Sequence, residues 1–125
     1  MARIFFMAFE AAGQYILIKK LRNMGHKLIV TEPRYPGFYD LLKQQVQPPE
    51  VVVCDASRLP SQAREACNYI RSLKAYRETP ILLYNVRPED GAKSLEQVPG
   101  ALLINDDGVE ATLEKVLRQA TPKPK

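Results

Sequence analysis

The chain has 125 residues, the length of one domain, and 46% hydrophobic with 26% charged residues is typical of a soluble globular protein. Its formal net charge of +4 is spread along the sequence, and the densest basic stretch (Lys19, Lys20 and Arg22) is too short to predict a nucleic-acid surface. Two cysteines, Cys54 and Cys67, and a single histidine give no metal-ligand spacing and no disulfide framework. No signal-peptide pattern or membrane-length apolar segment is visible, so we expect a cytoplasmic protein without membrane contact.

Five short apolar runs recur along the chain, and each is continuous rather than alternating. A continuous apolar run of this length is typical of a strand in a parallel sheet, because helices cover both of its faces. The five predicted strands are residues 4–9, 28–30, 51–54, 81–84 and 101–104.

Segments with a helical period separate these strands. The first places Ile18 and Leu21 on one face and is expected to stop at Gly25, a residue that favours the end of a helix. Ser61 is the expected N-cap of the third helix. The four later helices are predicted after residue 37, after residue 60, over about residues 88–98 and over residues 108–120.

Strict alternation of strands and helices predicts right-handed crossovers and a three-layer α/β architecture. Five strands suit a flavodoxin-like (βα)5 fold with a parallel sheet in the order 2-1-3-4-5. We expect residues 1–120 to form this single domain. After Thr121, residues 122–125 alternate proline and lysine, and we expect a disordered tail or the start of a linker over residues 121–125.

Ligands of an open parallel sheet bind beyond the carboxyl ends of its strands, which fixes where a site is expected. No glycine-rich phosphate loop follows the first strand, and Gly13 is the only glycine near it. We therefore predict neither nucleotide nor flavin binding, and no cofactor.

At this point the layout resembles the receiver domain of two-component signalling. Asp55 ends the third predicted strand, where receivers carry the phospho-accepting aspartate, and Ile70-Arg71 matches the hydrophobic-basic pair of their third helix. Pro80 opens the fourth strand and Gly100-Ala101 the fifth, as in receivers. The resemblance covers about residues 3–120 and implies a receiver-like fold that acts in signalling and not as an enzyme.

The resemblance ends at the phosphorylation pocket. Receivers hold Mg²⁺ with an acidic pair after the first strand, and the matching positions here are Ala8 and Phe9, with Glu10 as the only nearby acid. The serine or threonine that follows the fourth strand in receivers is replaced by Asn85, and the small residue after it by Val86.

The lysine that ends the fifth strand in receivers is also missing, and Asn105 stands in its place. Arg58 and Arg87 follow the third and fourth strands and are candidate anion contacts, although neither occupies the lysine position. Phosphoryl transfer depends on neutralising charge around the acceptor, so these departures argue against a working pocket and against a bound metal.

The preferred hypothesis is a pseudo-receiver that acts through protein contacts without normal aspartyl phosphorylation. By resemblance, its partner is expected on the surface of residues 88–120, and a homodimer is left open. An ordinary structural role for Asp55, as a carboxylate that caps a loop, fits this hypothesis.

Two alternatives are kept open. The first is an atypical phospho-accepting receiver that uses Asp55 in a phosphorelay. The second is a flavodoxin-like domain that binds a small molecule at the carboxyl edge of the sheet. Its expected contacts are Phe9, Tyr35, Asn85 and Asn105.

Overall fold

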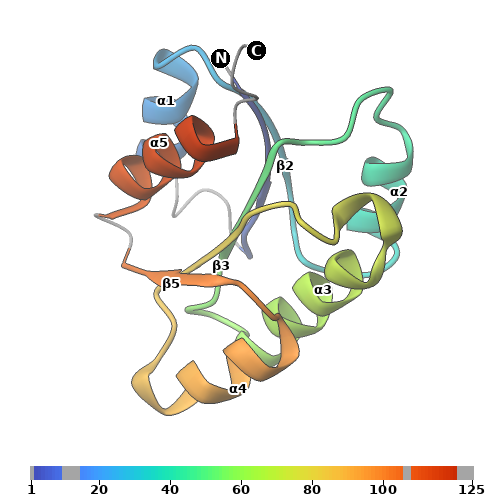
Figure 1. Ribbon diagram of the computed structural model, residues 1–125, viewed down its shortest axis with the longest axis vertical. Helices are drawn as coiled ribbons and strands as arrows, with labels where there is room; N and C mark the ends of the chain where they lie inside the picture. Colours follow the sequence, from blue (N-terminus) through green and yellow to red (C-terminus); the bar gives the residue numbers. More distant parts are fainter. Residues whose placement is uncertain (1, 10–14, 106–107, 121–125) are drawn as a thin grey trace.

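The computed structural model describes residues 2–9, 15–105 and 108–120, and these form a parallel sheet between two layers of helices (Figure 1). The strands are β1 (Arg3–Met7), β2 (Lys27–Thr31), β3 (Val51–Asp55), β4 (Ile81–Tyr84) and β5 (Leu102–Ile104). Their order in the sheet is β2-β1-β3-β4-β5, and all pairs are parallel, so the predicted topology is confirmed. No helix in the described ranges has the length and apolar character needed to cross a bilayer.

Five helices connect and cover the strands. They are α1 (Tyr15–Asn23), α2 (Gly37–Lys43), α3 (Pro60–Ser72), α4 (Gly91–Gln97) and α5 (Val109–Ala120), with short 3-10 turns η2 (Lys74–Tyr76) and η3 (Pro88–Asp90). Helices α1 and α5 lie on one face of the sheet, and α2, α3 and α4 lie on the other (Figure 1).

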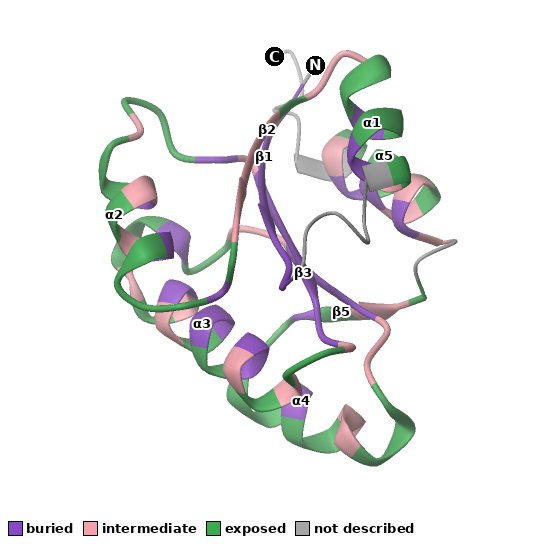
Figure 2. Cartoon of the chain, turned by 180° about the vertical axis from the view of Figure 1, so that it is seen from behind, coloured by how far each residue is buried: buried purple, intermediate pink, exposed green. Residues whose placement is uncertain are grey.

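Both faces of the sheet are buried, which explains the continuous apolar runs. In β3, Val52 and Cys54 pack under α2 and α3, whereas Val51 and Val53 pack under α1 and α5. Figure 2 shows the central strands buried along their length. Alternate side chains of a strand point to opposite faces, so a strand covered on both sides must be apolar at every position.

The ends of several elements differ from the sequence prediction. Strand β1 ends at Met7, and Ala8 and Phe9 lie in the turn that follows. Ser61 is not an N-cap, because α3 already begins at Pro60 and its cap position, Leu59, makes no side-chain capping hydrogen bond. Proline is favoured at a first helical position because its fixed φ suits the helix and its missing N–H needs no partner.

The predicted end of α1 is confirmed. Gly25 has a φ of 95°, which only glycine adopts readily. Its N–H donates to the carbonyl of Arg22 over 3.0 Å, and the N–H of His26 donates to that of Leu21 over 3.3 Å. This is a Schellman motif, which satisfies carbonyls that the helix end would leave without partners. Nearby, Lys20 forms an ion pair with Glu110 of α5 at 3.0 Å, which neutralises part of the basic stretch on α1.

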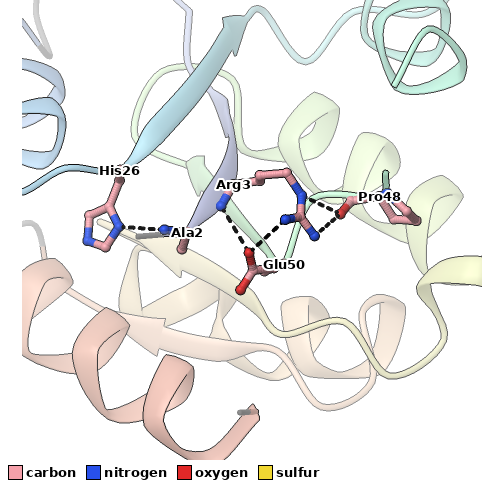
Figure 3. A network of polar contacts seen from close by, with 5 residues as sticks. All are labelled: Ala2, Arg3, His26, Pro48 and Glu50. Atoms are coloured by element: carbon pink, nitrogen blue, oxygen red, sulfur yellow. Dashed lines mark hydrogen bonds and ion pairs between the residues drawn. The ribbon is translucent and has the colours of Figure 1, made fainter. Parts of the chain in front are cut away.

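The amino end of the sheet is tied together by a polar network (Figure 3). Arg3 forms an ion pair with Glu50 at 3.2 Å, and its guanidinium donates to the carbonyl of Pro48 over 3.3 Å. The Nδ1 atom of His26 accepts the N–H of Ala2 over 3.2 Å. Partial burial lowers the pKa of His26, which favours the neutral ring that this hydrogen bond requires.

Arg71, the basic member of the Ile70-Arg71 pair, ties α3 to the loops before β4 and β5. Its Nη1 donates to the carbonyls of Tyr76, Arg77 and Thr79 over 3.1, 2.9 and 2.6 Å, and its Nε donates to that of Pro99 over 3.1 Å. Desolvation lowers the pKa of this guanidinium from its ordinary value. Arg71 therefore has a structural role at the amino end of the strands, whereas Asp55 lies at their carboxyl end.

Both cysteines lie in the core, Cys54 on β3 and Cys67 on α3. A hydrogen bond with Cys67, together with burial, raises the pKa of the Cys54 thiol. A buried thiol that stays protonated packs as a small apolar side chain.

Candidate functional site

The candidate site lies at the carboxyl end of β3, where Asp55 is the last residue of the strand. Asp55 is 2% exposed, and its Oδ1 accepts the N–H of Ser57 over 3.0 Å. The N–H of Ala56 donates to the carbonyl of Tyr84 over 3.0 Å and continues the ladder between β3 and β4. This geometry is an Asx turn, the local role that aspartate commonly takes at the end of a strand.

The positions matched to the receivers' acidic pair are apolar and buried. Met7 lies level with Cys54 in the sheet, so Ala8 and Phe9 reach the same edge as Asp55. The guanidinium carbon of Arg34 lies 4.9 Å from the centre of the Phe9 ring. A ring covered by a cation therefore lies at the end of β1 where the resemblance predicted one of two carboxylate positions.

These residues do not fit a magnesium site of the receiver kind. Mg²⁺ takes oxygen ligands in octahedral geometry, usually with one or two carboxylates. The side chains of Ala8 and Phe9 carry no oxygen. Arg34 covers the Phe9 ring, and it is paired with Glu32 at 3.3 Å. Within residues 2–9, 15–105 and 108–120, no three histidine, cysteine, aspartate or glutamate side chains are grouped to hold a metal. Glu10 lies outside the described residues.

Asn85, which follows β4, has a φ of 59° in the left-handed region. Asparagine is one of the few residues besides glycine that adopt this conformation without a large cost. The N–H of Asn85 donates to the carbonyl of Ile104 over 2.9 Å, which carries the β4–β5 pairing past the end of both strands. Val86 is half-buried and packs against the core under α3 and α4, so it fills space that a small residue would leave open.

The remaining predicted site residues lie on the surface of the same edge. Arg58, Arg87 and Asn105 are exposed. Arg87 and Asn105 line one hollow of about 200 Å³ beside β5, together with Val86 and Gly91. The structure thus brings an arginine and an amide together there.

The small-molecule alternative grouped Tyr35 with Asn105, and this grouping is wrong. Tyr35 follows β2, whereas Asn105 follows β5. These are the two outermost strands, with the whole width of the sheet between them. Tyr35 instead lines a cavity of about 300 Å³ with Phe38 of α2 and Tyr69 of α3. Sequence reasoning missed this cavity because Tyr69 reaches Tyr35 only through the packing of α3 beside α2.

Comparison with known proteins supports a fold and no closer relationship. No protein-family model matches the chain, and no curated protein does. The signal receiver domain of a signal transduction histidine kinase from Syntrophus aciditrophicus superimposes with a TM-score of 0.75 at 14% identity, covering 100% of this chain and 96% of its own. The chain has the receiver fold.

Two further solved structures agree. The chemotaxis response regulator CheY4 of Vibrio cholerae gives a TM-score of 0.69 at 22% identity and covers 93% of this chain and 98% of its own. A signal receiver domain of two-component signal transduction from Clostridium thermocellum gives 0.71 at 17% identity, with coverage of 94% and 98%. In the receiver fold of this chain, the residues after β1, β3, β4 and β5 meet at one edge, as described above.

The backbone at Asn85 allows a direct test. Asn85→Thr restores the residue type that receivers carry but puts a β-branched side chain at positive φ, which costs about 1–2 kcal/mol. Asn85→Gly removes that strain. We expect Asn85→Thr to unfold with a free energy roughly 1–2 kcal/mol below that of Asn85→Gly in urea titrations followed by circular dichroism. Equal stability of the two variants would show that the left-handed backbone does not constrain this position.

Proposed function

We propose that this chain is a pseudo-receiver, a signalling module that acts through protein contacts and does not undergo normal aspartyl phosphorylation. The observation that carries the proposal is the buried Phe9 ring, covered by Arg34, at the position matched to a metal-binding carboxylate. Asp55 beside it already accepts the N–H of Ser57. The receiver fold supports a role in signalling, and the departures around Asp55 support the loss of phosphorylation.

Electrostatics gives the size of the obstacle. A carboxylate that approaches an anionic phosphoryl donor to about 4 Å meets a repulsion of about 4 kcal/mol per pair of unit charges at an effective dielectric near 20. That barrier corresponds to roughly three decades in rate. A metal and a lysine normally remove this repulsion, and Ala8, Phe9 and Asn105 supply neither carboxylate nor ammonium. Arg58 and Arg87 remain proposed anion contacts at this edge.

A nuclear magnetic resonance titration tests this proposal. Mg²⁺ is added first and beryllofluoride, a mimic of the acyl phosphate, second. We expect the amide signals of Ser57, Asn85 and Asn105 to stay in place, because the pocket lacks the groups that would hold either ligand. Asp55→Asn serves as the matched control.

Saturable, Mg²⁺-dependent shifts of these amides that disappear in Asp55→Asn would contradict the proposal. That result would favour the alternative, a phospho-accepting receiver that uses Asp55.

We further propose that residues 1–120 form one cytoplasmic domain that works without metal or cofactor, with its protein partner on residues 88–120. Two aliphatic side chains of that surface support the assignment, since Leu95 on α4 is 48% exposed and Leu102 on β5 is 40% exposed. β5 is also an edge strand, which leaves one side of its backbone available for pairing. A second copy of the chain is the partner that this surface can be tested with directly.

Sedimentation velocity over a range of concentrations provides that test. If a homodimer forms through β5, the mass of the wild-type chain rises with concentration and Leu102→Arg stays monomeric. Val46→Arg introduces the same residue at a side chain that is 99% exposed and distant in sequence, and it is expected to behave as wild type. A wild-type chain that remains monomeric throughout, or a dimer unaffected by Leu102→Arg, would rule out this interface.

A further inference from the structure

Four aromatic side chains form a cluster on the face of the sheet covered by α2 and α3. We call Tyr35, Phe38, Tyr39 and Tyr69 the tyrosine cluster. The Tyr69 ring lies 5.5 Å from Tyr35, 5.9 Å from Phe38 and 5.3 Å from Tyr39, measured between ring centres. The cluster belongs to the surface as much as to the core, since Tyr35 is 63% exposed. Tyr35 packs against three other rings at centre-to-centre distances of 5.5–6.1 Å. Exposed apolar surface that is grouped in this way points to a binding role.

Three rings of the cluster open onto a cavity of about 300 Å³, which is the lower end of the size range for small-ligand sites. Its aromatic part is formed by Tyr35, Phe38 and Tyr69, and the rest of the lining is Pro33, Gln62, Glu65 and Ala66. Pro33 and Tyr35 come from the segment after β2, Phe38 from α2, and the others from α3. The cavity uses none of the residues around Asp55.

The electrostatics of this lining favour a cation. The face of an aromatic ring is electron-rich and attracts a positive charge within about 6 Å of its centre. Glu65 adds a carboxylate, and it forms no ion pair with any residue in the described part of the chain. One ring of the cluster already contacts an ammonium, since Nζ of Lys43 lies 4.8 Å from the centre of the Tyr39 ring.

Much of the lining is apolar, which suits a cation without N–H donors. A primary ammonium carries three N–H donors that need acceptors when water is removed. The aromatic rings and Pro33 offer apolar surface, and the polar side chains of the lining are Gln62 and Glu65, besides the tyrosine hydroxyls. A quaternary ammonium has no N–H donors, so it enters such a cavity without leaving donors unpaired. Desolvation and the neighbouring Tyr39 and Tyr35 raise the pKa of Tyr69 above its ordinary value.

We propose that the cavity between Tyr35, Tyr69 and Glu65 binds a quaternary ammonium group. The rings contact its methyl groups, and the Glu65 carboxylate lies on the open side as a counter-charge. Such a ligand of about seven heavy atoms is expected to bind with a Kd on the order of 1 mM or below.

Choline tests this site, and its neutral carbon isostere 3,3-dimethyl-1-butanol is the matched ligand. The chain has six tyrosines and no tryptophan, so its intrinsic fluorescence reports on tyrosine alone, and ring signals assigned by nuclear magnetic resonance identify Tyr35 and Tyr69. We expect saturable shifts of these two rings with choline, at constant ionic strength. The isostere is expected to bind about fivefold more weakly, since it lacks the charge.

Variants separate the ring and carboxylate contributions. Tyr35→Leu and Glu65→Gln change exposed side chains and are expected to weaken choline binding about two- to fivefold each. Glu114→Gln removes an exposed carboxylate from α5 and is expected to leave the affinity unchanged. A short peptide with trimethyl-lysine carries the same group, and a tighter Kd for choline or for this peptide identifies whether the group arrives free or on a protein.

Three results would overturn the proposal. They are the absence of saturable shifts with both choline and the peptide, equal affinity for choline and its isostere, and full binding by both Tyr35→Leu and Glu65→Gln. None of them bears on the proposal for Asp55, because the two sites share no residue.

Discussion

Burial of the sheet on both faces is the constraint on which the rest of this structure depends. All five residues of β3 are buried, and so are all four of β4. Each apolar side chain of this kind stabilises the fold by about 1.5–3 kcal/mol when it is fully removed from water. Two helical layers are then required. Because the strands between them are parallel, their carboxyl ends, and the turns that follow them such as Asp55–Ser57, lie at the same end of the sheet.

The fold and the chemistry of that edge are separable. The sheet needs apolar residues along β1 and β3, but it needs no carboxylate, threonine or lysine where the strands end. Phe9 and Val86 add apolar contacts at positions where a phosphorylation pocket needs charge or space. Arg34 over Phe9 strengthens this arrangement, since a cation on a ring face is favourable by about 0.5–1 kcal/mol at an exposed site. A receiver fold without the receiver pocket is therefore physically consistent.

Sequence reasoning reached the fold because strand order and layering depend on long apolar runs and their spacing. It failed where a single local contact decides the outcome. Ser61 gave way to Pro60 as the start of α3, and nothing in the sequence marked the left-handed backbone of Asn85. The pairing of Tyr35 with Asn105 overlooked that the predicted order itself places β2 and β5 at opposite edges. The tyrosine cluster depends on tertiary packing between α2 and α3, which periodicity does not report.

The central claim is that the carboxyl end of the sheet around Asp55 holds no receiver-type metal site. Thermal unfolding with and without Mg²⁺ tests this claim most directly. A metal that binds only the folded chain, present at about 100 times its Kd, would add about 2.7 kcal/mol of stability. For a chain of this size that gain raises Tm by roughly 10 °C. We expect no change in Tm between MgCl₂ and NaCl at equal ionic strength. A rise of several degrees that Asp55→Asn abolishes would contradict the claim and identify a working metal site.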